Sequence, residues 1–289
     1  MNKNDEIDNK IRREIQNGDM EDLVERETPA DEARRIKDED METMKMEEKR
    51  YEFNKDRHLH LLDGKLLTGC TTVLSILAKP ALISWAAKMA VEYIRENIVK
   101  FDITDLSQLE QLLSEAKKAY AKKKETAGDY GTKVHEKISL LISEAITLNK
   151  GFVKKDRKCK EKSIQNFIDW AIENKIKFLE TEKNVYSEKL WTGGIIDMVA
   201  VIDNKTWLID IKTSGSGIYP ENFAQMAGYH LMLNEMGLYP EIAGYIVLNL
   251  KEIGEIMEKR SISNEDNIKF FLACLTIYRQ QERLKSQTI

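Results

Sequence analysis

The chain has 289 residues, a third of them charged, and a net charge of −4. This length allows one catalytic domain with an appendage. The acidity is uneven, because residues 1–50 hold 17 acidic and 11 basic side chains, a net of −6 that leaves +2 for the rest. Overall acidity alone would argue against a nucleic-acid binder. The mildly basic body removes that argument, since lysine-rich runs at 117–124 and 154–162 could contact phosphates or simply be solvated.

The cysteine content and the lack of long apolar stretches limit the compartment. Cys70, Cys159 and Cys274 are far apart and show no CxxC spacing, which is typical of a reducing compartment and offers neither a disulfide framework nor a zinc site. No stretch reaches the roughly 18–20 consecutive apolar residues of a membrane span. The first residues also lack the pattern of a signal peptide. We therefore expect a soluble, intracellular protein with no membrane partner.

The first elements in chain order are a charged segment and a hairpin. Residues 1–50 contain no aromatic residue and predict either a disordered tail or a solvated helix. Alternation at 51–62 predicts a strand, Asp63-Gly64 a hairpin turn, and 65–70 the returning strand. Thr71 or Thr72 is expected to cap the next helix, which Pro80 interrupts.

Helical periodicity dominates the middle of the chain, and strand periodicity follows it. The predicted helices cover residues 81–99, 106–124, 132–148 (after Gly128) and 164–179. The predicted strands cover 184–190, 195–202 and 206–211, with Asp203-Asn204 as the last turn. A helix at 220–236, with Pro at its first turn and Gly237 past its end, precedes a strand at 242–250 and a helix at 265–284. This order predicts an α/β or α+β sheet flanked by helices, with an N-terminal helical portion.

Two of these strands carry the informative polar residues. The strand at 195–202 is apolar except for Asp197, and a buried carboxylate costs several kcal/mol unless it is paired or bound to a cation. In the following strand, alternation places Asp210 and Lys212 on one face, about 7 Å apart. A hairpin can bring Asp197 beside Asp210, where the two carboxylates repel each other unless one is protonated or a divalent cation such as Mg²⁺ lies between them.

This arrangement has a chemical and a structural interpretation. Cations held by Asp197 and Asp210 would offset the charge of a phosphodiester and lower the pKa of a bound water. Lys212 could hold that water or stabilise the developing charge. The structural interpretation is a plain Asp210–Lys212 salt bridge, with Asp197 capping a neighbouring turn. Isolation of Asp197 in an apolar strand, just after Gly193-Gly194, favours the chemical interpretation.

The spacing of these residues resembles a known family. Asp197 followed by Asp210-Ile211-Lys212 is similar to the PD-(D/E)xK nuclease superfamily, specifically its RecB-like exonuclease branch. Residues 131–136 (GTKVHE) resemble the family's helix with a metal-binding His, and 225–229 (QMAGY) resemble the Q-x-x-x-Y motif of the branch. Residues 71–90 look like the entry region of phage-type and mitochondrial-genome-maintenance-type exonucleases. The resemblance covers roughly residues 51–250.

The chain also departs from the family. Ile196 stands where the superfamily often has Pro, a frequent loss in this branch. The iron–sulfur members need four cysteines around the fold, whereas this chain has three, at other positions. No iron–sulfur cluster is therefore expected.

The resemblance implies a fold and a site. It implies a restriction-endonuclease-like mixed β-sheet flanked by helices, in a nuclease domain at 51–289 whose N-terminal hairpin and helical part ends at 130. The implied catalytic residues are Asp197, Asp210 and Lys212. The implied holders of Mg²⁺ or Mn²⁺ are His135, Asp197, Asp210 and Ile211, and the implied substrate-binding residues are Gln225, Tyr229, Thr213 and Ser214.

Several other residues have weaker claims. Glu136 lies about 100° around the helix from His135 and should not reach the same ion. Glu182 and Glu188 could support the site, but a solvated strand residue is the stronger interpretation for both. Trp85 is interpreted as core before a lid over substrate. The remaining histidines, His58, His60 and His230, are interpreted as surface or strand-edge residues.

The function that the resemblance implies is a metal-dependent DNA exonuclease acting in recombination, repair or end processing. Its expected place is the cytoplasm of a bacterial or phage-infected cell. The alternatives are an endonuclease cutting flaps, branches or single strands, and a non-catalytic DNA-binding subunit of the same fold. The acidic segment at 1–50 could dock a protein partner or compete with DNA. The sequence does not specify the oligomeric state.

Overall fold

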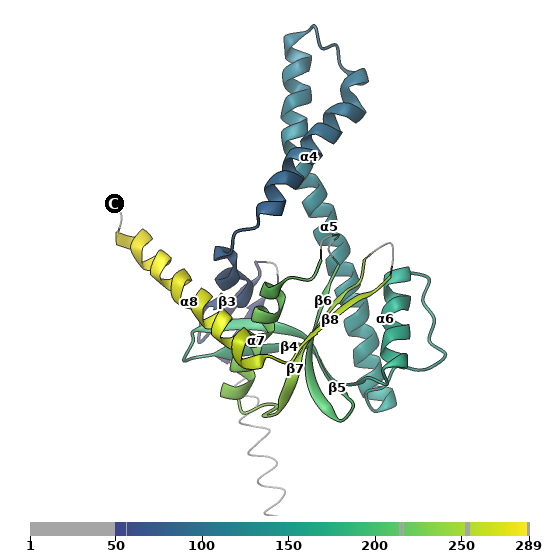
Figure 1. The fold of residues 1–289 in the computed structure, drawn as a ribbon, viewed down its shortest axis with the longest axis vertical. Coiled ribbons are helices and arrows are strands. Elements are labelled where there is room, and N and C mark those ends of the chain that lie inside the picture. The colour runs from purple at the N-terminus through teal and green to yellow at the C-terminus, as the bar shows by residue number, and fades with distance from the viewer. Residues whose placement is uncertain (1–49, 56, 214, 216, 252–254, 288–289) are drawn as a thin grey trace, which may run out of the picture. The chain divides into compact units, whose positions relative to one another are not determined.

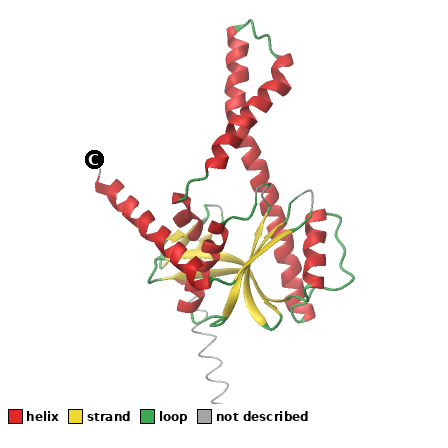
Figure 2. Cartoon of the chain, in the orientation of Figure 1, coloured by secondary structure: helices red, strands yellow, loops and turns green. Residues whose placement is uncertain are grey.

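The computed structural model describes residues 50–55, 57–213, 215, 217–251 and 255–287. The expectation for the segment at 1–50 therefore lies outside the described residues, apart from Arg50. Glu52–Ile289 form one compact unit. This unit has an α/β fold, as predicted, with a mixed sheet and helices on both of its faces (Figures 1 and 2).

The sheet has eight strands in the order β1-β2-β3-β5-β6-β7-β8, and β4 pairs with β5 off this path. The β3–β5 and β6–β7 pairs are parallel, whereas β2–β3, β4–β5, β5–β6 and β7–β8 are antiparallel. The strands are β1 (Tyr51–Asn54), β2 (Leu59–Leu62), β3 (Lys65–Gly69), β4 (Lys177–Ser187), β5 (Thr192–Ile202), β6 (Lys205–Lys212), β7 (Ile242–Asn249) and β8 (Met257–Ser261).

The helices cover the two faces of this sheet with separate apolar cores. The described helices are α3 (Cys70–Val73), α4 (Pro80–Asn97), α5 (Leu106–Asn149), α6 (Lys162–Glu173), α7 (Pro220–Glu235) and α8 (Asn264–Gln287), with 3-10 turns at Leu74–Ile76 and Ile98–Lys100. On one face, α3, α7 and α8 pack through residues such as Tyr229 and Phe271. On the other face, α5 and α6 pack through residues such as Ile138 and Phe167. Figure 1 shows the sheet between these two helical layers.

The α5 helix corrects the prediction of two helices separated near Gly128. It runs unbroken for 44 residues, from a cap in which Asp105 accepts a hydrogen bond from the Ser107 amide to an end at Lys150, which has φ +55°. A glycine inside a helix costs only about 0.5–1 kcal/mol relative to alanine. Burial of the C-terminal half of α5 against the sheet outweighs that cost. The N-terminal half pairs with α4 and extends beyond the sheet (Figure 1).

Other predicted boundaries were wrong in instructive ways. The predicted strand at 51–62 is two strands, β1 and β2, and the helix after β3 is a single turn whose cap is Gly69 without a side-chain hydrogen bond. Pro80 begins α4 rather than interrupting a helix. The predicted helix at 164–179 ends at Glu173, because Lys175 takes a left-handed φ of 50° and β4 begins two residues later. The charged edge strand β8 was not predicted.

The predicted turns are confirmed by their backbone angles. Asp63 and Gly64 both have positive φ, as do Asp203 and Asn204, which is the geometry that joins adjacent antiparallel strands tightly. Gly237 follows α7 with a φ of +69°. The Asp203-Asn204 turn fixes the β5–β6 hairpin that carries Asp197 and Asp210.

Among the described helices, none is by itself long and apolar enough to cross a membrane. The segments Cys70–Ile76 and Pro80–Lys100 meet the length and composition criteria only as a pair, which is bent by 87°.

Candidate metal centre

The candidate centre lies where β5 and β6 separate. Their antiparallel pairing extends as far as Met198 opposite Ile209, and Asp197 and Asp210 come directly after that last pair. One carboxylate oxygen of Asp197 accepts a hydrogen bond from the Ile211 amide at 2.7 Å. This bond satisfies a backbone donor that β5 no longer pairs. The point where β5 and β6 separate, here called the fork, thus holds Asp197 in a fixed orientation beside the end of β6.

The α5 helix adds a histidine to this fork. His135 Nδ1 lies 3.5 Å from Asp197 Oδ1, and the two side chains are 29% and 15% exposed. Glu136 points elsewhere and forms a 3.1 Å ion pair with Lys55, as expected for a neighbour about 100° around the helix.

The β4 strand adds a carboxylate that the sequence interpretation undervalued. In the β4–β5 ladder Thr181 pairs with Met198 and Lys183 with Ile196, which places Glu182 opposite Asp197. Glu182 has a left-handed φ of +49°, which is rare for a non-glycine residue and is found most often at turns and functional sites. One potential ligand atom each from His135, Glu182 and Asp197 lies within 4.8 Å of the others.

Asp210 and Lys212 form a buried ion pair next to this group. The ammonium of Lys212 donates to Asp210 Oδ1 at 2.9 Å and lies 2.7 Å from Oδ2. Asp210 is only 3% exposed, and its buried Oδ2 accepts no well-aligned hydrogen bond from the described residues. A buried carboxylate oxygen without a directed donor suits coordination of a hard cation.

The electrostatics of the group reflect crowded charges. Burial lowers the pKa of His135, but the charge and hydrogen bond of Asp197 outweigh it and raise that pKa to about 9. Burial and the charge of Asp197 raise the pKa of Asp210 to about 6, against the opposing effect of Lys212. The Glu182 residue is exposed, yet partial desolvation raises its pKa, and the charge of Asp197 adds to the shift. Burial opposes ionisation of Asp197, yet His135 and Lys212 hold its pKa below the ordinary value.

The Gln225 and Tyr229 side chains support Lys212 from α7. Gln225 donates to the Tyr229 hydroxyl at 2.7 Å, and its carbonyl oxygen accepts from Lys212 at 3.5 Å. Tyr229 is buried, and its ring lies so close to Gly194 that a Cβ there would be 2.3 Å from Cε1. The tyrosine thus fixes the position of Gln225, and only Gln225 of the two reaches the ion pair. This geometry supports a positioning role for Tyr229.

The other predicted site residues are placed as follows. Thr213 follows β6, and its hydroxyl would lie 2.9 Å from a Cβ at Gly131 of α5, so α5 passes close to the end of β6. The backbone amide of Ile211 donates a hydrogen bond to the Asp197 carboxylate. Ser214 lies outside the described residues.

Some of the weaker predictions change. His230 is not a surface or strand-edge residue, because it is 7% exposed and its Nδ1 lies 2.9 Å from the Tyr245 hydroxyl. Trp85 is not in a core: it is half-buried between α4 and α5, with its ring edge-on to Tyr120 at 5.0 Å. Glu188 is exposed. Among the described residues, no cysteine belongs to a group that could hold a metal ion.

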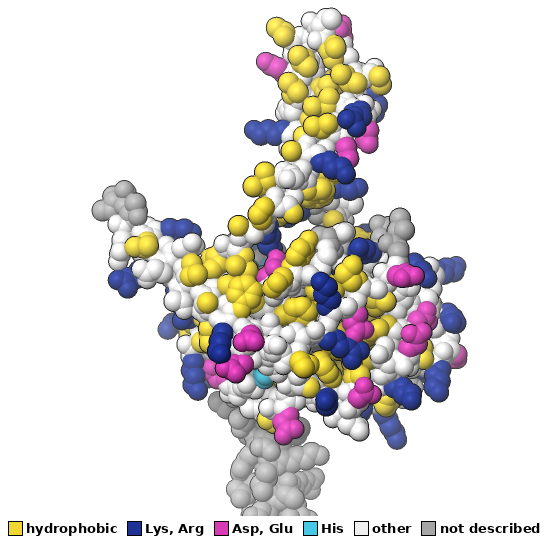
Figure 3. Space-filling view, in the orientation of Figure 1, with side chains coloured by type: hydrophobic (Ala, Val, Ile, Leu, Met, Phe, Trp, Pro, Cys, Tyr) yellow, Lys and Arg dark blue, Asp and Glu magenta, His cyan; other side chains and the backbone are white. Residues whose placement is uncertain are grey.

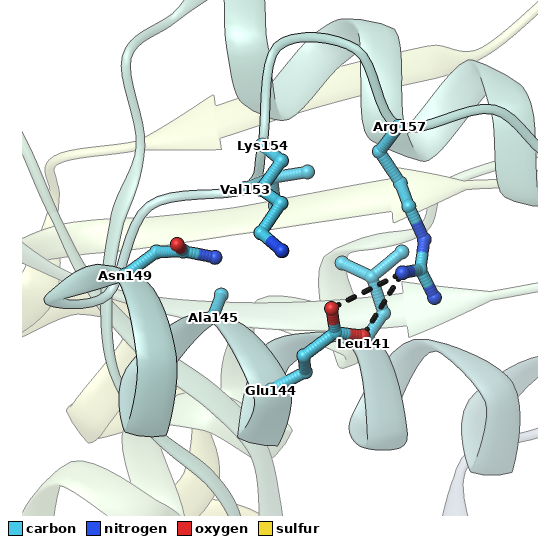
Figure 4. A pocket seen from close by; sticks show the side chains of 7 residues that line it. All are labelled: Leu141, Glu144, Ala145, Asn149, Val153, Lys154 and Arg157. Carbon is cyan, nitrogen blue, oxygen red and sulfur yellow. Dashed lines mark hydrogen bonds and ion pairs between the residues drawn. The ribbon is translucent and has the colours of Figure 1, made fainter.

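A separate pocket lies away from this centre, at the C-terminal end of α5. It is lined by Leu141, Glu144, Ala145, Asn149, Val153, Lys154 and Arg157. Figure 4 shows the guanidinium of Arg157 directed at the carboxylate of Glu144, with N–O distances of 3.0 and 3.1 Å. The pocket includes none of the candidate metal ligands.

Comparisons with known proteins identify no family for this chain. No family model matches the chain, and no curated protein matches it. Among solved structures 21 chains match, including one titled "Crystal structure of SSO0001", which is 15% identical with a TM-score of 0.23. That match covers 39% of this chain and 57% of the other, so this chain spans little more than half of that protein's length. A score at this level adds nothing to the fold described above.

Proposed function

We propose that this protein is a metal-dependent DNA nuclease of the PD-(D/E)xK type, with Asp197, Asp210 and Lys212 as its catalytic residues. One observation carries the proposal: ligand atoms of His135, Glu182 and Asp197 converge within 4.8 Å, beside the buried Asp210–Lys212 pair. The motif resemblance supports DNA as the substrate and a restriction-endonuclease-like arrangement of the sheet.

The donor set fits Mg²⁺ or Mn²⁺. Carboxylate oxygens are the ligands that both ions prefer, and a neutral imidazole is acceptable to Mn²⁺. The residues that would hold the ion are Asp197, Asp210, Glu182 and His135. A bound divalent cation would supply charge neutralisation at the phosphodiester and a water of lowered pKa.

The chain's own residues perform the remaining steps. Asp210, with a pKa of about 6, is ionised at neutral pH and so is available as a ligand. Burial lowers the pKa of Lys212, but Asp210 and Asp197 raise it above its ordinary value, so this ammonium stays charged and can hold the attacking water or the departing oxygen. Gln225 limits the directions that Lys212 can take. His135 must release its proton before its nitrogen can bind a cation.

The leading form of the activity is an exonuclease, which the resemblance to the RecB-like branch supports. The test uses the full chain with end-labelled linear DNA, single- and double-stranded, and with closed circular DNA, in Mg²⁺, in Mn²⁺ or in EDTA. We expect metal-dependent loss of linear DNA only. Cleavage of circles would favour the endonuclease alternative, and binding without cleavage in either metal would favour a non-catalytic subunit.

A matched pair of variants separates the site from the fold. Asp210→Asn should lower the cleavage rate by about 100-fold or more, as loss of a directed electrostatic group does in other sites. Asp203→Asn makes the same chemical change in the turn of the same hairpin, where Asn tolerates the left-handed backbone, and should leave the rate unchanged. Wild-type cleavage by Asp210→Asn would overturn the assignment.

A further inference from the structure

One face of α5 connects the candidate metal centre with a run of lysines. Residues 117–124 contain five lysines and no acidic residue, and they lie on the same unbroken helix as His135. Lys117 is 18 residues before His135, which is five full helical turns at 3.6 residues each, and Lys124 is 11 residues before it, three turns and about 20°. Lys117, Lys124 and His135 therefore share one face, which we call the lysine face.

The lysine face is open to solvent. The residues buried in this half of α5 are Leu112 and Ala116, about 140° and 100° around the helix from Lys117. The α4 helix contacts this half of α5 at Glu115 and Tyr120. Lys117 and Lys124 are both exposed. Figure 3 shows Lys and Arg side chains standing out from this helical pair.

Between the lysines and the metal centre, the same face carries only small side chains. The residues at its middle are Ala121, Gly128 and Gly131, none with a side chain beyond Cβ. A Cβ at Gly128 would meet nothing within 4 Å, whereas one at Gly131 would lie 2.9 Å from the Thr213 hydroxyl at the end of β6. The face therefore lies against Thr213 at Gly131, and no described atom outside the helix approaches within 4 Å of a Cβ position at Gly128.

From these observations we infer that the lysine face binds the phosphodiester strand next to the bond that is cut. The helical rise places Lys124 about 16 Å and Lys117 about 27 Å from His135 along the axis. A strand in B-form DNA advances about 3.4 Å per nucleotide, so these lysines would meet phosphates about five and about eight nucleotides from the metal centre. This inference rests on the proposed function, because it takes the metal centre as the place of cleavage.

The second basic run is a poorer binding surface for this strand. Of the residues 154–162, Arg157 is already paired with Glu144 in the pocket of Figure 4. That pocket also involves Asn149, the last residue of α5, which lies 14 residues beyond His135 in the direction away from Lys124. The lysines of this second run are also exposed, so it is the alignment of Lys117 and Lys124 with His135 along α5 that favours the lysine face.

The test compares two double variants of the full chain with equal charge. Lys117→Ala with Lys124→Ala removes the lysine face, and Lys118→Ala with Lys123→Ala removes two exposed lysines of the same run from other faces. Binding to fluorescent 20-nucleotide single-stranded and duplex DNA is measured in EDTA over a range of salt concentrations. Each lost phosphate contact lowers the slope of log affinity against log salt by about 0.7 for a single strand or 0.9 for duplex.

The expected result is a slope lower by about 1.4 or 1.8 for the first double variant and near wild type for the second. Equal slopes in the two variants, or no change in either, would overturn the inference, since charge alone and not the face would then determine binding. Cleavage by wild-type protein is measured in parallel. If wild-type protein cleaves DNA but the two variants have equal slopes, only the inference about the lysine face is rejected. If the slopes are as expected but wild-type protein does not cleave DNA, only the nuclease proposal is rejected.

Discussion

The His135–Asp197 pair makes the stability of the metal-free protein depend on pH. Burial acts to lower the pKa of His135, but Asp197 raises it to about 9, above the ordinary 6.5. The folded chain therefore binds more protons than the unfolded chain between these two values. The stabilisation is fully present below pH 6.5 and is lost as the pH rises through about 9.

The size of this loss follows from the two pKa values. At about 1.4 kcal/mol per pH unit, the interval from 6.5 to about 9 corresponds to about 3 kcal/mol of unfolding free energy. For a compact unit of this size, this loss lowers the melting temperature by roughly 6–12 °C. Asp210, whose pKa is about 6, is already mostly ionised at pH 6.5 and adds little in this range.

The measurement is thermal and urea unfolding in EDTA at pH 6.5 and 9.5, for wild type, His135→Asn and His58→Asn. The His135→Asn variant should lose about 3 kcal/mol less than wild type between the two pH values, while the exposed His58 variant should behave as wild type. Under the proposed function, samples in which saturating Mn²⁺ replaces EDTA should also lack the alkaline loss, because neutral His135 would then bind the ion. An unchanged alkaline loss in His135→Asn would refute the reasoning.

Two further predictions concern single positions near the centre. Glu182→Gln should weaken Mn²⁺ binding, measured by titration calorimetry, by about 10-fold or more. Glu188→Gln, a control that is also exposed but lies outside the ligand group, should not, and equal affinities would remove Glu182 from the ligand set. Gly194→Ala should lower the free energy of unfolding by about 1–3 kcal/mol, because its Cβ would lie 2.3 Å from the Tyr229 ring. Gly128→Ala, with nothing within 4 Å, should instead raise it by about 0.5–1 kcal/mol, and urea titrations yielding equal values for the two variants would contradict both expectations.

Local rules were sufficient to predict the parts of the site that depend on one strand or one turn. Alternation placed Asp210 and Lys212 on one face of β6, and the structure joins them in an ion pair. The Asp203-Asn204 turn follows from the left-handed preference of these residues, and it fixes the hairpin that brings Asp197 to the same end of the sheet. Helical spacing likewise placed Gln225 and Tyr229 on one side of α7.

The parts that depend on register or tertiary packing could not be predicted in this way. Glu182 reaches the site only because the β4–β5 ladder sets it opposite Asp197 and its backbone is left-handed, and neither property is encoded in a local pattern. Gly128 is a local signal for a helix end, yet burial of the following turns keeps α5 continuous. The β8 strand is short and charged, which suits a sheet edge but lacks the apolar alternation from which strands are predicted.

The alkaline loss of stability and the proposed affinity for a cation both depend on the proton of His135. Three carboxylates, Glu182, Asp197 and Asp210, lie close together, and the positive charges that act on Asp197 are those of His135 and Lys212. The raised pKa of His135 shows that a proton on this ring offsets part of the negative charge. A cation that binds the His135 nitrogen must displace that proton, because only the neutral ring can be a ligand. Under the proposed function, cation affinity should therefore rise with pH up to about 9, over the same range in which the metal-free protein loses stability. The proton, or the proposed cation in its place, would offset the repulsion between these closely spaced acidic residues.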